Sequence, residues 1–253
     1  MEVHAHTHTP RKKWTHYLWE FLMLFLAVFC GFLAENKREH MIEHQREKQF
    51  MRSMVEDIKS DTSLLSNGIR GSVEIMTANF QLLKELTNPE TANNSLRAFS
   101  LWKHSDFYPN FLQNDRTLQQ LKNSGSLRLI RNKNVSDSIM EYDRQLRWLF
   151  EAQDNVNHII LQNQQYSFRL FSTLSFGKKI LADSLQYAVW SVDSVLRREP
   201  VPLLNTDPSF IEEVYGFRLE FADYMTDLHR NQQSSYGRAK RLIDFIKKEY
   251  RLK

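Results

Sequence analysis

A single apolar stretch near the N-terminus constrains this chain more than any other feature. Residues Trp14 to Ala34 read WTHYLWEFLMLFLAVFCGFLA, and they are apolar apart from Thr15, His16 and Glu20. An α-helix rises 1.5 Å per residue, so about 20 such residues cross a hydrocarbon core of about 30 Å. Only a helix satisfies its own backbone hydrogen bonds in that environment. The sequence therefore predicts a transmembrane helix over residues 14–34.

Two other uses of an apolar N-terminal stretch fit this one poorly. A cleaved signal peptide has an apolar run of roughly 7–15 residues and then a small-x-small cleavage site. Here the run is longer, and cleavage after Ala34 or Gly31 would place Phe32 or Phe29 at the −3 position. A lipoprotein would be acylated at Cys30, but the residue before it is a bulky phenylalanine where such sites need a small one. Both interpretations are set aside in favour of a retained anchor.

The flanks of the stretch predict its orientation. Arg11, Lys12 and Lys13 adjoin it within a short tail, residues 1–13, and Lys37 and Arg38 lie on the far side. Positive charge close to a span favours the cytoplasmic side, and the tail is the shorter segment to keep there. We therefore expect residues 1–13 to be a cytoplasmic tail and the bulk of the chain to lie on the other side of the membrane.

The composition favours helices in the rest of the chain. Of its 253 residues 42% are hydrophobic and 25% are charged, which is enough for a core. Glycine occurs 7 times and proline 6 times, which argues against a sheet-and-turn fold and against glycine-rich phosphate loops. The one cysteine, inside the apolar stretch, permits no intramolecular disulfide and no multi-cysteine metal site. The net charge is +4 with both signs interleaved, so we expect no nucleic-acid partner.

Residues 35–66 are predicted to form a helical stalk that continues the span. From Glu35 to Asn67 the chain contains neither proline nor glycine, and its first part, ENKREHMIEHQREK, is mostly charged. Asn67 and Gly68 predict a stop or a kink in the helix, and residues 67–253 are predicted to form the bundle domain. The later part of the stalk becomes amphipathic, because its inward residues recur at helical spacing: Phe50, Met51, Met54, Val55, Ile58, Thr62 and Leu65.

The first part of the bundle is predicted to contain short helices. A helix over Ser72–Leu86 is expected to turn Val73, Met76, Phe80 and Leu83 toward the core. Another covers Thr117–Ser124 and ends at Gly125, which is free to take the left-handed conformation that closes helices.

Two long helices are predicted to build the bundle. The first starts at a cap at Asn134 or Ser136, and three polar residues interrupt its seam, which either sets the register or lines a polar cavity. A break at Gly177 precedes a helix over Lys178–Arg198, and a capping box at Ser209 begins the last helix, which runs to about Tyr250. The seam of the first long helix is Ile139, Tyr142, Leu146, Leu149, Gln153, Val156, Ile160, Asn163, Ser167, Leu170 and Leu174.

Residues within the predicted span are candidates for contacts between helices. Glu20 is the one acid past the interface, and such acids mark a partner helix or extend toward water. Ala27, Gly31 and Ala34 place small residues along one face, which lets helices approach closely.

Histidines give the only metal-site candidates, and each is weak. His40 and His44 with Glu43 spell H-x-x-E-H, which matches the inverted zincin pattern. Zinc catalysis also needs a third protein ligand and a dry pocket, and this segment is a charged stalk. We therefore interpret it as a solvated helix face. The alternating histidines of the tail, residues 4–8, are interpreted as part of a polar tail.

Two blocks of the sequence carry a family resemblance. Residues 12–50, KKWTHYLWEFLMLFLAVFCGFLAENKREHMIEHQREKQF, and residues 117–143, TLQQLKNSGSLRLIRNKNVSDSIMEYD, resemble an uncharacterised family of single-pass membrane proteins from Bacteroidota. The resemblance implies an inner-membrane anchor and a helical periplasmic domain, and it brings no catalytic residues.

These observations predict an all-α protein: an N-terminal transmembrane helix, a stalk, and an antiparallel bundle with two long helices. The expected function is that of a membrane-anchored scaffold or interaction subunit of a cell-envelope assembly, either a homo-oligomer or bound to a membrane protein. The alternative is an extracytoplasmic ligand-sensing bundle that acts through a partner, with Gln153 and Asn163 at a cavity. No catalytic motif stands in the sequence, so we expect neither an enzyme nor a cofactor.

Overall fold

The computed structural model describes residues 14–181 and 200–252, and these residues form an all-α protein. The chain divides into two compact units, residues 1–51 and 52–253. Helix α1 (Trp14–Leu86) contributes residues to both units. In the described ranges the only β-type pairing is an isolated bridge between Phe171 and Leu203. The predicted fold class is confirmed.

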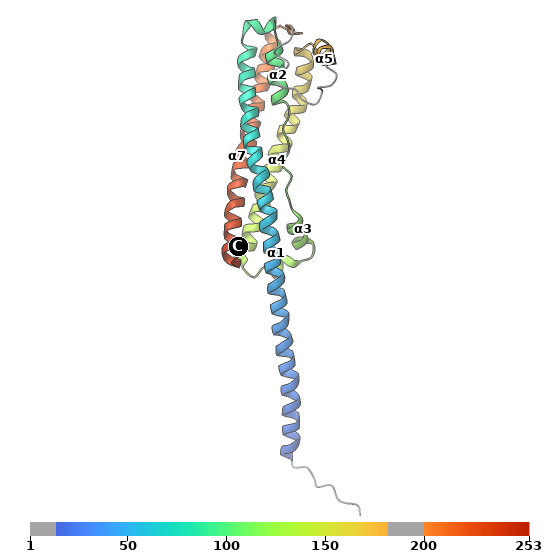
Figure 1. The fold of residues 1–253 in the computed structure, drawn as a ribbon, viewed down its shortest axis with the longest axis vertical. Helices are drawn as coiled ribbons and strands as arrows, with labels where there is room; N and C mark the ends of the chain where they lie inside the picture. The colour runs from blue at the N-terminus through green and yellow to red at the C-terminus, as the bar shows by residue number, and fades with distance from the viewer. Residues whose placement is uncertain (1–13, 182–199, 253) are drawn as a thin grey trace, which may run out of the picture. The chain divides into compact units, whose positions relative to one another are not determined.

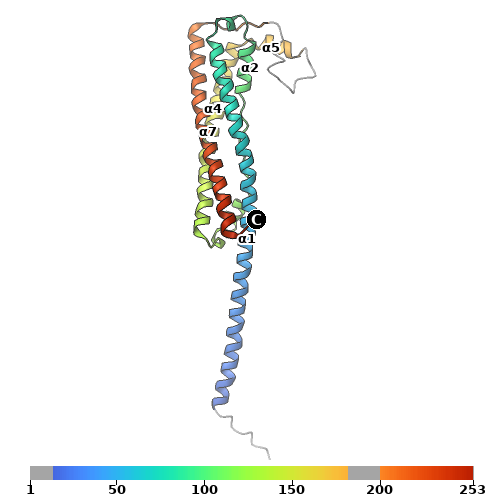
Figure 2. The same ribbon diagram turned by 60° about the vertical axis from the view of Figure 1, so that its left-hand side comes forward.

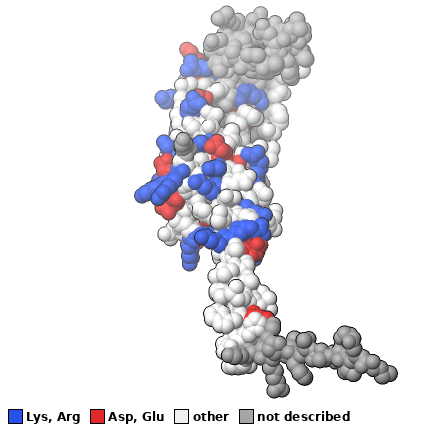
Figure 3. Space-filling view, turned by 60° about the horizontal axis from the view of Figure 1, so that its bottom comes forward, with Lys and Arg blue, Asp and Glu red and all other residues white. Residues whose placement is uncertain are grey.

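The described part of the first unit, residues 14–51, consists of α1 alone. It contains a window long and apolar enough to cross a membrane, and none of that window is buried. Figure 3 shows one stretch of almost uncharged surface, as the apolar residues of this window require, whereas Lys and Arg lie beside Asp and Glu over the visible face of the bundle. Residues 14–34 are therefore a candidate membrane span.

The predicted stop at Asn67 and Gly68 is wrong, because α1 continues through both residues to Leu86. Residues 72–86 are thus the last part of α1 and not a separate helix. Glycine inside a helix costs about 1 kcal/mol relative to alanine, which a packed helix tolerates. Gly68 serves a close approach instead, since a Cβ atom there would lie 2.7 Å from the side-chain Nε2 of Gln232.

Three long helical segments run side by side in the second unit: residues 52–86 of α1, α4 (Lys133–Leu170) and α7 (Pro208–Tyr250), as Figures 1 and 2 show. The 38-residue α4 and the 43-residue α7 are antiparallel, which confirms the predicted pair of long helices. Between α1 and α4 the chain returns along the bundle through α2, an extended segment and α3. The shorter elements are η1 (Pro89–Ala92), α2 (Leu96–Ser105), α3 (Arg116–Asn123), η2 (Ser126–Leu129) and α5 (Thr173–Leu181).

The long helices begin at caps that lie earlier than predicted. Asn132, and neither Asn134 nor Ser136, caps α4 by accepting hydrogen bonds from backbone N–H groups of the first turn. Asp207 caps α7 in the same way and also accepts the hydroxyl hydrogen of Ser209, so the predicted capping box is wrong. At the end of α3, Gly125 has the predicted left-handed conformation, with a φ of 66°.

The end of α4 also differs from the prediction. The helix ends at Leu170, and the next residue, Phe171, is extended and wholly buried against the rings of Phe99 and Trp102. Helix α5 then runs through Gly177, so the predicted break there is wrong. The anchoring of Phe171 in this aromatic cluster explains why the chain turns earlier. Most of the predicted helix 178–198 lies outside the described residues.

The core of the second unit follows the predicted seams with two exceptions. One is Leu174, the last residue of the predicted seam, which lies beyond the end of α4 and is 69% exposed. Most predicted seam residues of α4 are buried, including the polar Gln153, Asn163 and Ser167. On α1, however, Val73 and Phe80 were expected inside and are 47% and 50% exposed. Polar contacts decide this orientation, because Ser72 and Asn79 turn inward to α7 and rotate Val73 and Phe80 outward.

Candidate functional site

The segment between α2 and α3, residues 106–115, is an extended leg that runs along the bundle without helical structure. Its backbone N–H and C=O groups therefore lack intrahelical partners, and Tyr108 and Phe111 within it are buried. Buried backbone groups need hydrogen-bond partners elsewhere. Asp61 and Gln153 supply such partners. Three further polar side chains of the long helices bind a side chain of the leg or the elements at its two ends, and we call the whole set the polar seam: Asp57, Asp61, Gln153, Arg218 and Gln232.

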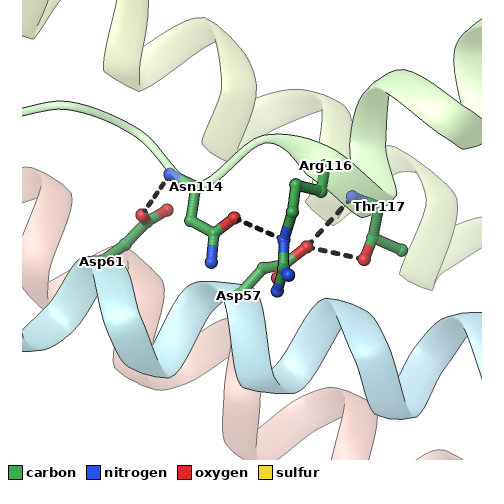
Figure 4. Close-up of polar contacts among 5 residues, drawn as sticks. All are labelled: Asp57, Asp61, Asn114, Arg116 and Thr117. Carbon is green, nitrogen blue, oxygen red and sulfur yellow. Dashed lines mark hydrogen bonds and ion pairs between the residues drawn. The ribbon is translucent and has the colours of Figure 1, made fainter.

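Asp57 on α1 holds the start of α3, as Figure 4 shows. Its carboxylate accepts hydrogen bonds from the backbone N–H of Thr117 at 3.0 Å, from the hydroxyl of Thr117 at 2.6 Å and from Nη2 of Arg116 at 2.7 Å. The residue that precedes α3 in the chain, Asp115, makes no capping hydrogen bond from its side chain. A carboxylate of another helix therefore caps α3.

Asp61 lies one helical turn further along the same face of α1 and binds the end of the leg. Its carboxylate accepts the backbone N–H of Asn114 at 2.8 Å and the hydroxyl hydrogen of Tyr142 on α4 at 2.9 Å. Only 1% of the Asp61 side chain is exposed. This one carboxylate thus joins α1, the leg and α4.

The two carboxylates titrate differently. Burial alone would raise the pKa of Asp57, but the hydrogen bonds from Thr117 and Arg116 hold it below its ordinary value. Burial raises the pKa of Asp61 to about 6, although the hydrogen bonds from Asn114 and Tyr142 lower it. The negative charge of nearby Asp57 raises the pKa further. Asp61 is therefore the member of the pair that takes up a proton in mildly acidic solution.

Glutamine side chains bind the middle of the leg. The amide of Gln153 on α4 accepts the backbone N–H of Phe111 at 2.7 Å and donates to its carbonyl oxygen at 3.4 Å. Gln232 on α7 is hydrogen-bonded through Nε2 to the hydroxyl of Tyr108. Because the Gln153 amide is engaged with the leg, it does not line an open cavity. Asn163 is wholly buried, and its amide has no partner among the residues described.

Arg218 on α7 occupies the start of the leg and is wholly buried. Its guanidinium donates to Oδ1 of Asn79 on α1 at 2.7 Å and to the hydroxyl of Ser105 at the end of α2 at 2.5 Å. Asn79 returns a hydrogen bond to the backbone carbonyl of Arg218 at 2.9 Å. The guanidinium carbon lies 4.8 Å from the ring of Trp102 and 4.5 Å from that of Phe221. One cation thus ties α1, α2 and α7 together.

The acid whose charge acts on Arg218 is Asp106, although the two side chains are too far apart to form an ion pair. Burial lowers the pKa of Arg218 to about 9, against the charge of Asp106, so the guanidinium is charged at pH 7. Burial raises the pKa of Asp106 to about 6, against the charges of Arg218 and Lys103. Nη1 of Arg218, Oδ1 of Asp106 and Nε1 of Trp102 are buried and have no hydrogen-bond partner within residues 14–181 and 200–252.

Sequence reasoning missed four of the five residues of the polar seam, all except Gln153, although a signal was present for Asp57, Asp61 and Arg218. Asp57 and Asp61 are acids on the stripe of α1 that also carries Met54, Ile58 and Leu65. A charged residue at core spacing must find a partner when the helix packs. The same signal marks Arg218, which lies between two buried residues of α7, Val214 and Phe221.

The candidate residues of the span lie on the exposed surface of α1. Oε1 of Glu20 is 3.2 Å from Nε2 of His16, one turn earlier. Ala27 and Ala34 are exposed, and a Cβ atom at Gly31 would meet nothing within 4 Å. Their predicted role in packing against another helix stays a prediction.

The histidines of the inverted zincin pattern each face a glutamate. Nδ1 of His40 is 3.6 Å from Oε2 of Glu43, and Nδ1 of His44 is 3.3 Å from Oε2 of Glu47. Within residues 14–181 and 200–252 no group of three His, Cys, Asp or Glu side chains is arranged to hold a metal. The histidines of the tail lie outside the described residues.

One contact combines residue types used in nucleophilic catalysis. The hydroxyl oxygen of Ser72 on α1 is 2.7 Å from Nδ1 of His229 on α7, and it also donates to the backbone carbonyl of Ile69. The Ser72 side chain is wholly buried, so a substrate has no access to it without separation of α1 from α7. We therefore interpret the pair as a structural link between two helices.

In the residues that the structure describes, the fold and this site define an all-α protein with one candidate membrane span and a bundle held by buried polar contacts. Comparison of the chain with protein-family models, with curated proteins and with solved structures finds no match.

Proposed function

We propose that this protein is a membrane-anchored scaffold subunit of a cell-envelope assembly, without catalytic activity of its own, and that it associates with a second copy of itself through α1. In this proposal residues 14–34 anchor the chain in a bacterial inner membrane, residues 1–13 are cytoplasmic and the bundle is periplasmic. The candidate span supports the anchor, and the arginines and lysines before it support the orientation.

The observation that carries the proposal is an exposed apolar stripe on α1, formed by Ile69, Val73, Met76 and Phe80. These residues follow the i, i+4, i+7 spacing of a helix face that packs against another surface. Val73 is 47% and Phe80 50% exposed, while Ile69 and Met76 are partly covered. The sequence of this stripe has the spacing of a packed helix face, but no other described segment of the same chain covers it fully.

A second copy of the chain is the partner that this stripe fits best. A stripe along one helix face is self-complementary about a two-fold axis, so the same residues serve both copies. The stripe has fewer residues than the roughly 20–30 per partner of a typical soluble complex. Copies anchored in one membrane are concentrated relative to each other, so a small contact suffices there.

Disulfide crosslinking in native membranes tests the proposal. Val73→Cys in a Cys30→Ser background places the only thiol of the full-length chain on the stripe, and we expect oxidation to produce a dimer of two chains. Asn67→Cys is the matched control, because Asn67 is exposed on the far side of the same helix. Phe80→Glu combined with Val73→Cys should remove the crosslink. Equal crosslinking from positions 67 and 73, or none from 73, would contradict the proposal.

A second candidate function, an extracytoplasmic ligand-sensing bundle that acts through a partner protein, is favoured by one observation. A pocket of about 550 Å³ opens between α4 and α7 and is lined by side chains of both charges. Pockets that bind small molecules commonly have volumes of roughly 300–1,000 Å³. The ligand expected at Gln153 is not favoured, because that amide is bonded to the leg. Saturable stabilisation of the purified protein by a small molecule in a thermal-shift screen would support sensing.

A further inference from the structure

Contacts between α4 and α7 form a series of rungs along the two antiparallel helices. Near one end Nδ2 of Asn132 donates to Oε2 of Glu249 at 2.8 Å. Further along, Nη1 of Arg238 lies 2.9 Å from Oε1 of Glu141. Asn132, the cap of α4, forms the first rung with a residue of α7, and Glu141 of α4 forms the second. The residue numbers run in opposite directions along the two helices.

The position between these two rungs is open. One turn from Glu141 toward the start of α4 lies Asp137, and one turn from Arg238 toward the end of α7 lies Arg241. Their opposite charges suit them for the next ion pair of the series. The structure records no ion pair between them, and the pocket of about 550 Å³ lies at this position, with both residues in its lining.

The pocket presents complementary chemistry on its two walls. The α4 wall carries the carboxylate of Asp137 and the hydroxyl of Ser138, whose hydrogen is donated to the backbone carbonyl of Asn134 at 2.7 Å. That hydroxyl oxygen therefore has lone pairs left to accept a hydrogen bond from a ligand. The α7 wall carries the guanidinium of Arg241, and below it Leu242 is buried and Phe245 is partly exposed.

This arrangement restricts the class of ligand. A simple anion would be attracted by Arg241 but repelled by the carboxylates of Asp137 and Glu141. A simple cation would be attracted by these carboxylates but repelled by Arg241. An apolar molecule would remove charged groups from water without pairing them, which costs free energy. A molecule that carries both charges and an apolar group pairs with each wall at once.

We propose that the pocket between α4 and α7 binds a free α-amino acid with an apolar side chain. Its ammonium group is placed to meet Asp137 and Ser138, and its carboxylate meets Arg241, whose planar guanidinium suits a two-point contact. The apolar side chain packs on Phe245 and Leu242. The site is separate from the apolar stripe of α1, so this proposal does not depend on self-association.

Calorimetric titration of the full-length protein in mild detergent tests the proposal, with L-phenylalanine and L-leucine as the probes. We expect saturable binding of at least one of them. The analogues of that amino acid that lack one charge, its amide and its deaminated acid, should each bind at least 10-fold more weakly. This result would show that the site recognises both the ammonium group and the carboxylate of the amino acid.

Substitutions assign the binding to the pocket. Asp137→Asn and Arg241→Gln should each weaken binding at least 10-fold, and since both residues are exposed, the thermal unfolding of the variants should match that of the parent. The matched control is Lys240→Gln, because Lys240 is exposed beside the pocket residues but lies over the ring of Tyr236. Absence of saturable binding in the folded protein, equal binding of the single-charge analogues, or binding unchanged by both substitutions would overturn the proposal. Crosslinking at Val73 reports separately on the proposed scaffold.

Discussion

Replacement of Asp61 by asparagine should make the bundle less dependent on pH. The carboxylate of Asp61 is buried and accepts hydrogen bonds from the Asn114 backbone and the Tyr142 hydroxyl. An asparagine has nearly the same shape and keeps an oxygen for the Asn114 N–H, while its NH₂ can donate to the Tyr142 oxygen. The substitution thus removes the buried charge and preserves the contacts.

The sign and the size of the effect follow from the pKa of Asp61. Burial raises that pKa from its ordinary value of 3.8 to about 6. A carboxyl group with a raised pKa stabilises the folded state fully below its unfolded pKa, and this contribution is lost as the pH rises through the folded pKa. One pKa unit corresponds to about 1.36 kcal/mol, so a shift of about two units amounts to about 3 kcal/mol. Relative to Asp61→Asn, the parent protein should lose this stability between about pH 4 and pH 7.

Thermal unfolding of the full-length protein in detergent, followed by circular dichroism from pH 4 to pH 7.5, measures this difference. For a domain of this size about 1 kcal/mol shifts the midpoint by about 2–4 °C. The midpoint of Asp61→Asn should therefore rise relative to the parent by about 10 °C across the range. Titrating groups remote from Asp61 are shared by both proteins and cancel, and Asp154→Asn, at an exposed site on α4, is the control. A constant difference, or a parent that gains stability relative to Asp61→Asn as the pH rises, would refute the reasoning.

Three further changes test other contacts of the bundle. Gly68→Ala should lower the free energy of unfolding by about 1–2 kcal/mol, because the new Cβ atom meets the side chain of Gln232. Gly71→Ala should raise it by about 0.5–1 kcal/mol, because a Cβ atom there meets nothing within 4 Å. Denaturant titration should therefore give changes in the free energy of unfolding of opposite sign for the two variants. Arg218→Ala should cost about 3–5 kcal/mol in the same assay, since it leaves buried polar partners unsatisfied. Asp57→Ala should cost about 1–2 kcal/mol and speed amide hydrogen exchange in α3, whose cap it removes. Unchanged exchange in α3 would contradict that role.

Helical periodicity predicted much of the fold because it is a local property. The long apolar spacing of α4 and α7 appears in the sequence without knowledge of any partner, and both helices are antiparallel neighbours as expected. The left-handed Gly125 after α3 is likewise a local requirement. The caps were placed too late, because several Asn, Asp and Ser residues near each start can serve and the choice depends on which side chain reaches the first-turn N–H groups.

The polar seam could not be assembled from the sequence. Asp57 lies 60 residues before Thr117, and no local pattern relates the two. Gln153 was recognised as an interruption of an apolar seam, but its partner, the backbone of Phe111, belongs to a segment with no periodicity of its own. The pairing of such groups is decided only when the helices pack.

The sequence by itself determined the candidate span, the all-α class and the existence of the two long helices α4 and α7, because hydropathy and helical spacing act within a few turns of chain. Only the tertiary structure decided which face of α1 turns inward. Asn79 faces Arg218 on α7, and this buried pair outweighs the burial of Phe80, which stays half exposed. The physical reason is that an unpartnered buried guanidinium costs more free energy than an exposed apolar ring.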